Sequence, residues 1–180
     1  SYMLVNGVLI PLSAFLIMRF GGRSLFLTAM LLFTAGTLIC GISPNFSTML
    51  TGRLIQAVGG GILQPLVMTT ILFIFPPESR GKGMGIFGLA MMFAPAVGPT
   101  LSGWVIENYS WRIMFYSLVP VGVIVIIFGF FLFKNMTEPK KIKLDTAGAI
   151  LSVVGFAALL YGVSEAGSDG WDDPIVLSTV

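Results

Sequence analysis

Arg53 is the one ionisable residue that lies well inside an apolar stretch of this 180-residue chain. A charge at that depth in a bilayer is energetically costly, so it marks a functional site by default. Gln56, Gly60 and Gln64 follow at offsets of three, seven and eleven residues, which places the four positions on one helical face. The pattern predicts a polar face that looks into a cavity rather than into lipid.

A structural explanation of Arg53 stays open at this point. The residue lies about ten Å below the expected helix start, within reach of the interface for a snorkelling arginine. The sequence offers few residues for enzymatic chemistry. The chain has no histidine, and no Asp or Glu falls inside an expected span, whereas an enzyme needs convergent acids, a nucleophile with its base, or metal ligands. We predict no catalytic residue, no metal site and no cofactor.

The charge-free run of 24 residues at 83–106 carries a second pattern. Its length suffices to cross a bilayer, which takes about 20 apolar residues. Small residues recur every four positions, as a seam for close helix packing. They are Ala90, Ala94, Gly98 and Ser102. The adjacent row should bend the helix, and it consists of Pro95, Pro99 and Gly103. A closely packed, bent helix without a further role would also explain both rows.

The segment LIMRFGGRSLF, residues 16–26, forms the first connection. Arg19 and Arg23 flank the glycine pair Gly21 and Gly22, between apolar stretches too close together for a flexible loop. Anchoring of the cytoplasmic side by positive charge is one explanation of the two arginines.

The elements that must position these residues follow from the distribution of charge. Only 10% of the residues are charged and 56% are hydrophobic, with a mean hydropathy of +0.95, whereas soluble domains carry about 25% charged residues. Charge-free intervals and a turn at 43–45 predict a series of helices. These lie near 2–18, 24–43, 46–75, 84–106, 112–133 and 146–164, with the start of another at 174–180. We predict an all-α polytopic membrane protein of about six spans plus the start of another.

Orientation follows from the basic residues. If the first connection is cytoplasmic, alternation places eight of the ten Lys and Arg residues on that side, and the reverse would violate the positive-inside rule. The eight are Arg19, Arg23, Arg80, Lys82, Lys134, Lys140, Lys141 and Lys143. The basic residues therefore determine topology, and the net charge of +2 gives no reason to expect a nucleic-acid partner. On the opposite side, Glu107 and Arg112 are expected to pair across a short turn.

Three of these patterns resemble signatures of the major facilitator superfamily. The string GPTLSG at 98–103 resembles the antiporter signature in the fifth helix of its drug exporters. The string RLIQAVG at 53–59 resembles the helix-four signature, with Ala57 in place of the family's first glycine. The first connection resembles the loop between helices two and three, with Ala14 and Met18 in place of the family's glycine and aspartate.

The resemblance implies a role for each group of residues. For Arg53 and Gln56 it implies proton coupling. For the helix that carries the antiporter signature it implies a tight seam on which two halves of the protein rock; the residues are Pro95, Gly98, Pro99, Ser102 and Gly103. For the first connection it implies a cytoplasmic gating loop, formed by Arg19, Gly21 and Arg23.

The last part of the chain resembles one branch of the superfamily. The sequence KLD at 143–145 and the sequence GSDGWDDP at 167–174 are similar to the EmrB/QacA type of drug:proton antiporter, which has fourteen transmembrane helices. On that mapping the chain is an internal fragment of a longer protein. Residues 1–133 are helices two to six of the N-terminal six-helix half, 134–145 a basic cytoplasmic linker, and 146–180 an extra central helix and the start of the next.

The function that the resemblance implies is secondary active transport rather than enzymatic catalysis. A proton-coupled antiporter would export lipophilic or cationic drugs across the bacterial plasma membrane, with small molecules, protons and the lipid bilayer as partners. The isolated chain is expected to be inactive, because it lacks the opposing half. A metabolite symporter or uniporter of the same superfamily stays open, as does a membrane-embedded structural component, and the oligomeric state is not defined by the sequence.

Overall fold

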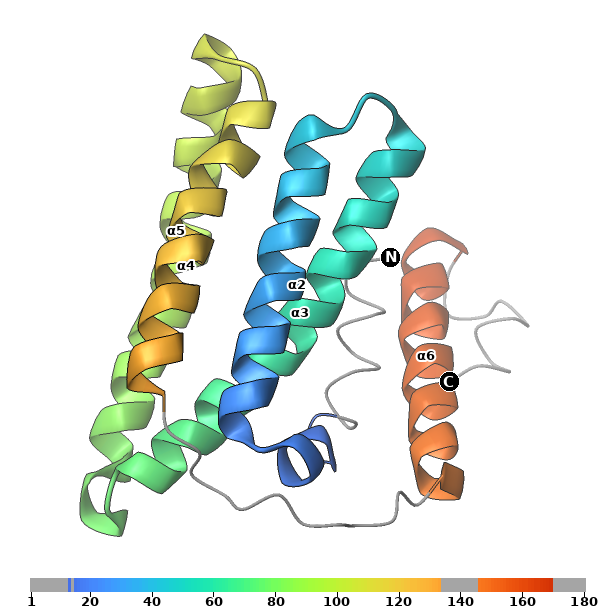
Figure 1. Ribbon diagram of the computed structural model, residues 1–180. Coiled ribbons are helices and arrows are strands. Elements are labelled where there is room, and N and C mark those ends of the chain that lie inside the picture. Colours follow the sequence, from blue (N-terminus) through green and yellow to red (C-terminus); the bar gives the residue numbers. More distant parts are fainter. Residues whose placement is uncertain (1–12, 14, 134–145, 170–180) are drawn as a thin grey trace.

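The computed structural model describes Ser13, residues 15–133 and residues 146–169, and the elements in these ranges are helices (Figure 1). After a helical segment at 15–20 come five long helices and the 3-10 turn η1 (Pro77–Ser79). The helices are α2 (Gly22–Ile42), α3 (Phe46–Ile74), α4 (Arg80–Asn108), α5 (Arg112–Leu132) and α6 (Thr146–Asp169). Within the described ranges, α2, α3, α4 with η1, and α5 are long and apolar enough to cross a membrane. The predicted all-α membrane architecture is confirmed.

The predicted limits of α2, α3 and α5 agree with the structure to within two residues. α4 begins at Arg80 rather than near residue 84, and α6 continues to Asp169 rather than ending near 164. The reason is the same in both places: the prediction ended helices at the first charge, whereas a helix continues where its charged side chains can reach water. The predicted start of another helix at 174–180, and most of the predicted helix at 2–18, lie outside the described residues.

Local signals set the helix ends. Asn45 precedes α3, and its Oδ1 accepts from the backbone nitrogen of Thr48 at 2.9 Å, which satisfies one of the free N–H groups at a helix start. At the other end, Pro76 and Pro77 follow Phe75 and end α3, because proline cannot donate to a preceding carbonyl. The predicted turn at 43–45 therefore separates α2 from α3.

Small residues let α2 and α3 approach closely. A Cβ atom on Gly36 of α2 would lie 2.5 Å from the backbone nitrogen of Gln56, and one on Gly59 of α3 would lie 2.5 Å from the carbonyl oxygen of Ala29. Neither distance leaves room for a side chain, so the two backbones touch at both levels. Close backbone contact of this kind is how membrane helices associate, since lipid offers no hydrophobic driving force between them.

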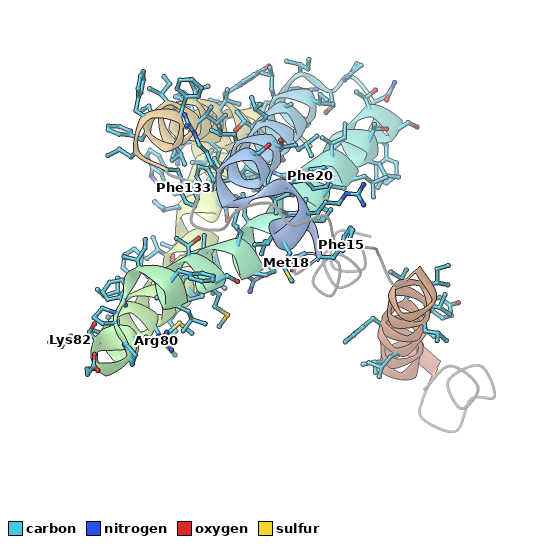
Figure 2. The ribbon with its side chains drawn as sticks, turned by 60° about the horizontal axis from the view of Figure 1, so that its bottom comes forward. Phe15, Met18, Phe20, Arg80, Lys82 and Phe133 are labelled. Carbon is cyan, nitrogen blue, oxygen red and sulfur yellow. The ribbon has the colours of Figure 1, made fainter. Side chains whose placement is uncertain are left out.

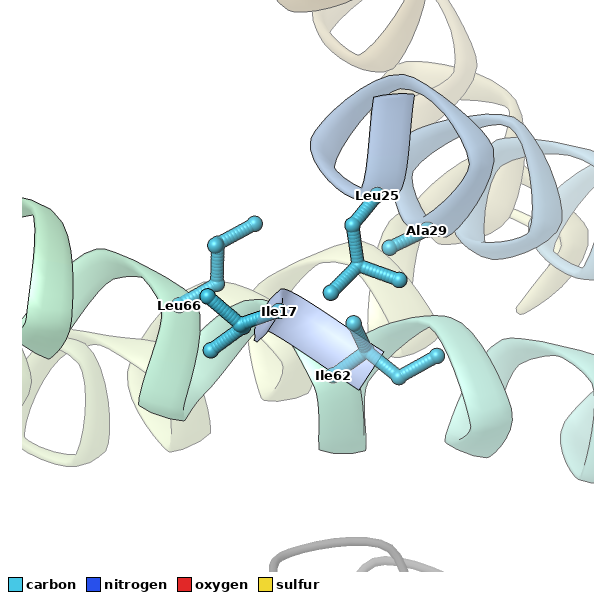
Figure 3. Close-up of a cluster of buried hydrophobic side chains, with 5 residues drawn as sticks. All are labelled: Ile17, Leu25, Ala29, Ile62 and Leu66. Atoms are coloured by element: carbon cyan, nitrogen blue, oxygen red, sulfur yellow. The ribbon is translucent and has the colours of Figure 1, made fainter. Parts of the chain in front are cut away.

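A cluster of buried apolar side chains joins the first connection to this pair of helices (Figure 3). Ile17 precedes the glycine pair, Leu25 and Ala29 belong to α2, and Ile62 and Leu66 belong to α3. All five side chains are at most 6% exposed. The first connection is therefore packed onto the bundle and is not a free loop.

The helix ends are arranged as the alternating topology requires. The start of α2, the end of α3, the start of α4 and the end of α5 lie toward the lower end of the bundle in Figure 1. Figure 2 views that end, where Phe20, Arg80, Lys82 and Phe133 are labelled. This is the side predicted to be cytoplasmic. α6 stands apart from α2–α5 in both views.

Candidate functional site: a polar chain across the α2–α3 interface

A chain of hydrogen bonds links Arg53 of α3 to α2. The guanidinium donates through Nη1 to Oε1 of Gln56 at 3.1 Å, about one turn further along α3. Gln56 donates through Nε2 to Oγ1 of Thr37 at 2.9 Å, and Thr37 donates to the carbonyl oxygen of Phe33 at 2.7 Å. Gln56 is 4% exposed and Thr37 is 1% exposed. The chain therefore crosses the interface of two apolar helices.

The carbonyl oxygen of Phe33, at the end of this chain of hydrogen bonds, determines which group donates at each step. A backbone carbonyl only accepts, so the hydroxyl of Thr37 donates to Phe33 and its oxygen is left to accept from the amide of Gln56. Since that amide presents its NH2 group to Thr37, its oxygen faces Arg53. Gln56 and Thr37 are neutral side chains, and their hydrogen bonds hold the guanidinium in place.

Arg53 also contacts α5. Its guanidinium carbon lies 5.2 Å from the ring centroid of Phe115, within the range of a cation–π interaction. The Phe115 ring is buried, whereas Arg53 itself is exposed on the described part of the bundle. The guanidinium is thus held by α3 and α5 and keeps an open side. A snorkelling arginine would instead extend along its own helix toward the near interface.

Two of the four positions of the predicted polar face come together in the structure. Gln56 contacts Arg53, whereas Gly60 is half-buried and Gln64 is exposed further along α3. Sequence reasoning missed Thr37, which completes the chain. Its signal was a hydroxyl directly after Gly36, since a glycine there permits the close helix contact that a buried amide needs.

The residues of the antiporter signature lie on a different surface. Pro95, Gly98, Pro99 and Gly103 are exposed on α4, and α4 continues through both prolines as one helix. Ser102 donates to the carbonyl oxygen of Pro99 at 3.1 Å. Added Cβ atoms on Gly98 and Gly103 would meet nothing within 4 Å. The structure therefore does not bring these residues to Arg53, and their predicted seam is a surface of the described bundle.

The first connection separates its two arginines. Arg19 is exposed and lies over the rings of Phe15 and Phe20, at 5.7 and 5.9 Å from their centroids. Arg23 turns the other way, and its Nη2 donates to the carbonyl oxygen of Phe130 in α5 at 2.6 Å. Between them, Gly21 has φ 77° and ψ 151° at the start of α2. That conformation explains why the connection needs a glycine at this position.

We expect Gly21→Ala to lower the free energy of unfolding by about 1–3 kcal/mol, because alanine rarely adopts a positive φ. A thermal unfolding curve of the purified protein in detergent, followed by thiol labelling of buried cysteine, measures the loss. Gly81→Ala is the matched control, since it lies in the first turn of α4 and an added Cβ there meets nothing within 4 Å. Equal melting temperatures for the two variants would contradict the argument.

The predicted pairing of Glu107 with Arg112 is wrong. Arg112 donates through Nη2 to the carbonyl oxygen of Ser43 at 2.8 Å, and its guanidinium carbon lies 4.5 Å from the ring centroid of Trp111. The physical reason is that a carbonyl at the end of α2, distant in sequence, lies closer than the carboxylate across the local turn. The contact ties the start of α5 to the end of α2.

Comparison with known proteins finds relatives that are named as a transporter or as drug-resistance proteins. The chain is 86% identical over its full length to the Uncharacterized MFS-type transporter YhcA of Bacillus subtilis (strain 168), covering 34% of that protein. It is 43% identical over 98% of its length to the lincomycin resistance protein LmrB of the same strain, covering 37% of it. It is 33% identical over 94% of its length to a multidrug resistance protein B homolog of Mycobacterium tuberculosis (strain ATCC 25618 / H37Rv), covering 32% of it.

The chain therefore spans about a third of the length of these relatives. The family model described as Major Facilitator Superfamily matches residues 1–176, which include α2–α6 and the first connection. With this match and the membrane-length helices, the chain belongs to the major facilitator superfamily of transporters.

Proposed function

We propose that the whole protein is a drug:proton antiporter of the bacterial plasma membrane that exports lipophilic or cationic compounds. Relatives named for lincomycin resistance and multidrug resistance support the substrate class. The observation that carries the proposal is the exposed guanidinium of Arg53, held by Gln56 and Phe115 at the side of an apolar bundle. On the EmrB/QacA mapping, α6 is the first of two extra helices among fourteen.

A fixed guanidinium gives a direct means of coupling. An opposite charge within about 4–6 Å favours the ionised form of a carboxyl group and lowers its pKa. We propose that an acid from a helix beyond the described residues faces the open side of Arg53 in one conformation and leaves it in the other. The acid then releases its proton when it meets Arg53 and binds one when it departs. The Gln56–Thr37 chain keeps the guanidinium in place throughout.

The other two site groups supply the moving contacts. The exposed seam of α4 offers Gly98 and Ser102 as a surface for an opposing helix, which is what rocking of two halves against each other needs. The first connection, packed onto α2 and α3, presents Arg19 outward on the side proposed to be cytoplasmic. We propose that Arg19 is the arginine that contacts the opposing half when that side closes.

Transport assays on the full-length protein test the proposal. Inside-out vesicles with an imposed proton gradient, acidic inside, should accumulate ethidium, and nigericin should abolish the accumulation by collapsing the gradient. Ethidium movement in the same direction as protons would indicate a symporter, and movement that follows only its own gradient a uniporter. No transport of any tested compound would favour a structural component. The 180-residue chain alone should transport nothing.

A further inference from the structure

Two arginines occupy electrostatically unfavourable positions in their own helices. Arg23 lies in the first turn of α2, and Arg112 is the first residue of α5. The N-terminus of a helix carries a partial positive charge, so a cation there opposes the helix dipole. The first turns of α2 and α5 hold no acidic residue, and each arginine binds a neighbouring helix.

The neighbour of Arg23 is the C-terminal end of α5. Arg23 donates to the carbonyl oxygen of Phe130 at 2.6 Å, and its guanidinium carbon lies 5.2 Å from the Phe130 ring centroid. Because α5 ends at Leu132, this carbonyl is one of the last four, which have no donor within a helix. Beside it, the rings of Phe26 and Phe133 stack with centroids 4.8 Å apart. We name these contacts of Arg23 and Phe26 with α5 the first-loop contact.

The neighbour of Arg112 is the C-terminal end of α2. Arg112 donates to the carbonyl oxygen of Ser43 at 2.8 Å, and Ser43 is the residue that directly follows the last residue of α2. Ser43 is 2% exposed, and its hydroxyl already donates to the carbonyl oxygen of Cys40 at 2.8 Å. We name the Arg112–Ser43 pair the turn contact. It mirrors the first-loop contact with the roles of the two helices exchanged.

Close packing continues between these two ends. Gly122 and Gly129 of α5 lie seven residues apart, about two turns, and so share one face. A Cβ atom on Gly122 would overlap the side chain of Thr34, and one on Gly129 would overlap the ring of Phe26. α5 therefore presents a face of glycines to α2. The two helices are in close contact between the two arginine contacts.

We propose that Arg23 and Arg112 are reciprocal caps, each binding the C-terminal carbonyls of the other's helix, and that they keep α2 and α5 joined as one unit through transport. Arg112 is then a positioning residue and not a surface anchor. The two arginines of the first connection therefore differ: Arg23 binds the end of α5, whereas Arg19 is exposed. The part of this inference that concerns the transport cycle rests on the proposed function.

A cross-link between α2 and α5 tests whether they move as one unit. On a Cys40→Ser background, Thr34→Cys with Gly122→Cys places two Cβ atoms 3.2 Å apart. Disulfides span about 3.5–4.5 Å between Cβ atoms, so the bond forms once the two positions move apart by a few tenths of an ångström. Oxidation with copper phenanthroline should leave ethidium export in full-length protein within about twofold of the dithiothreitol-reduced value, because no relative motion is blocked. Export that is lost on oxidation and regained on reduction would overturn the proposal.

A distance measurement gives an answer even if the protein exports no ethidium. Spin labels on Leu31 of α2 and Leu118 of α5, both exposed, report the spacing of the two helices. In nanodiscs the distance distribution should be the same at acidic and alkaline pH, with or without ethidium. Arg112→Ala should broaden it, whereas Arg80→Ala, at an exposed arginine in the first turn of α4, should not. A shift between conditions, or an unchanged distribution in Arg112→Ala, contradicts the proposal.

Discussion

Replacing Arg53 by alanine is expected to abolish proton-driven ethidium export by the full-length protein, while insertion into the membrane stays normal. The guanidinium is held by the buried amide of Gln56 and by the ring of Phe115, so it is a fixed charge that a methyl group cannot replace. Without that charge, an acid that faces the site has no reason to release its proton there. We expect a loss of at least roughly a hundredfold in the gradient-driven initial rate, the scale of about 2–3 kcal/mol in coupling.

Arg53→Lys distinguishes coupling from anchoring. A lysine keeps the positive charge but not the planar fork that binds Gln56 and an acid together, so activity should return only in part. An arginine that served only as an anchor would tolerate lysine fully, and alanine would then cost stability alone. Arg80→Ala is the control for removal of an exposed arginine from the same chain and should export normally. Wild-type rates in Arg53→Ala would remove Arg53 from the coupling mechanism.

The helices follow from the sequence because their limits are set locally. Charge-free intervals measure a membrane span, and the turn at Asn45 and the proline pair at 76–77 end helices whatever surrounds them. The errors at the start of α4 and at the end of α6 come from treating charged residues as helix ends. A charge ends the apolar part of a helix but not its hydrogen-bond ladder.

The side-chain partners do not follow from the sequence, because they depend on which faces of two helices meet. Thr37 reaches Gln56 across nineteen positions, and Arg112 reaches Ser43 across sixty-nine. Periodicity identifies a polar face on α3 but not the residue of α2 that lies against it. For Arg112, local spacing pointed to Glu107, and the cross-helix carbonyl was the actual acceptor. Arg53 and Gln56 were predictable as a pair because they belong to one helix.

Gly98 is singled out by the sequence, but in the described bundle it is exposed and an added Cβ would meet no other atom within 4 Å. The membrane-spanning part of α4 contributes nothing to the buried interior, and Gly83, near its start, is its one buried residue in the described chain. An added Cβ on Gly98 meets open space. A large side chain there should therefore be compatible with the α2–α5 bundle, so any effect on export reports on contacts that Gly98 makes with another part of the whole protein.

We expect Gly98→Leu to reduce the initial rate of ethidium export by roughly tenfold or more, because a leucine on a small-residue seam keeps an opposing helix from approaching closely. Expression and the thermal unfolding curve should match wild type. Gly85→Leu is the matched control: it lies on the same helix, an added Cβ also meets nothing within 4 Å, and its thirteen-residue offset places it well away from the seam. Gly98→Ala, which keeps the seam small, should retain most of the export. Equal rates for Gly98→Leu and Gly85→Leu would show that no helix packs against this seam, and the rocking role of α4 would then be wrong.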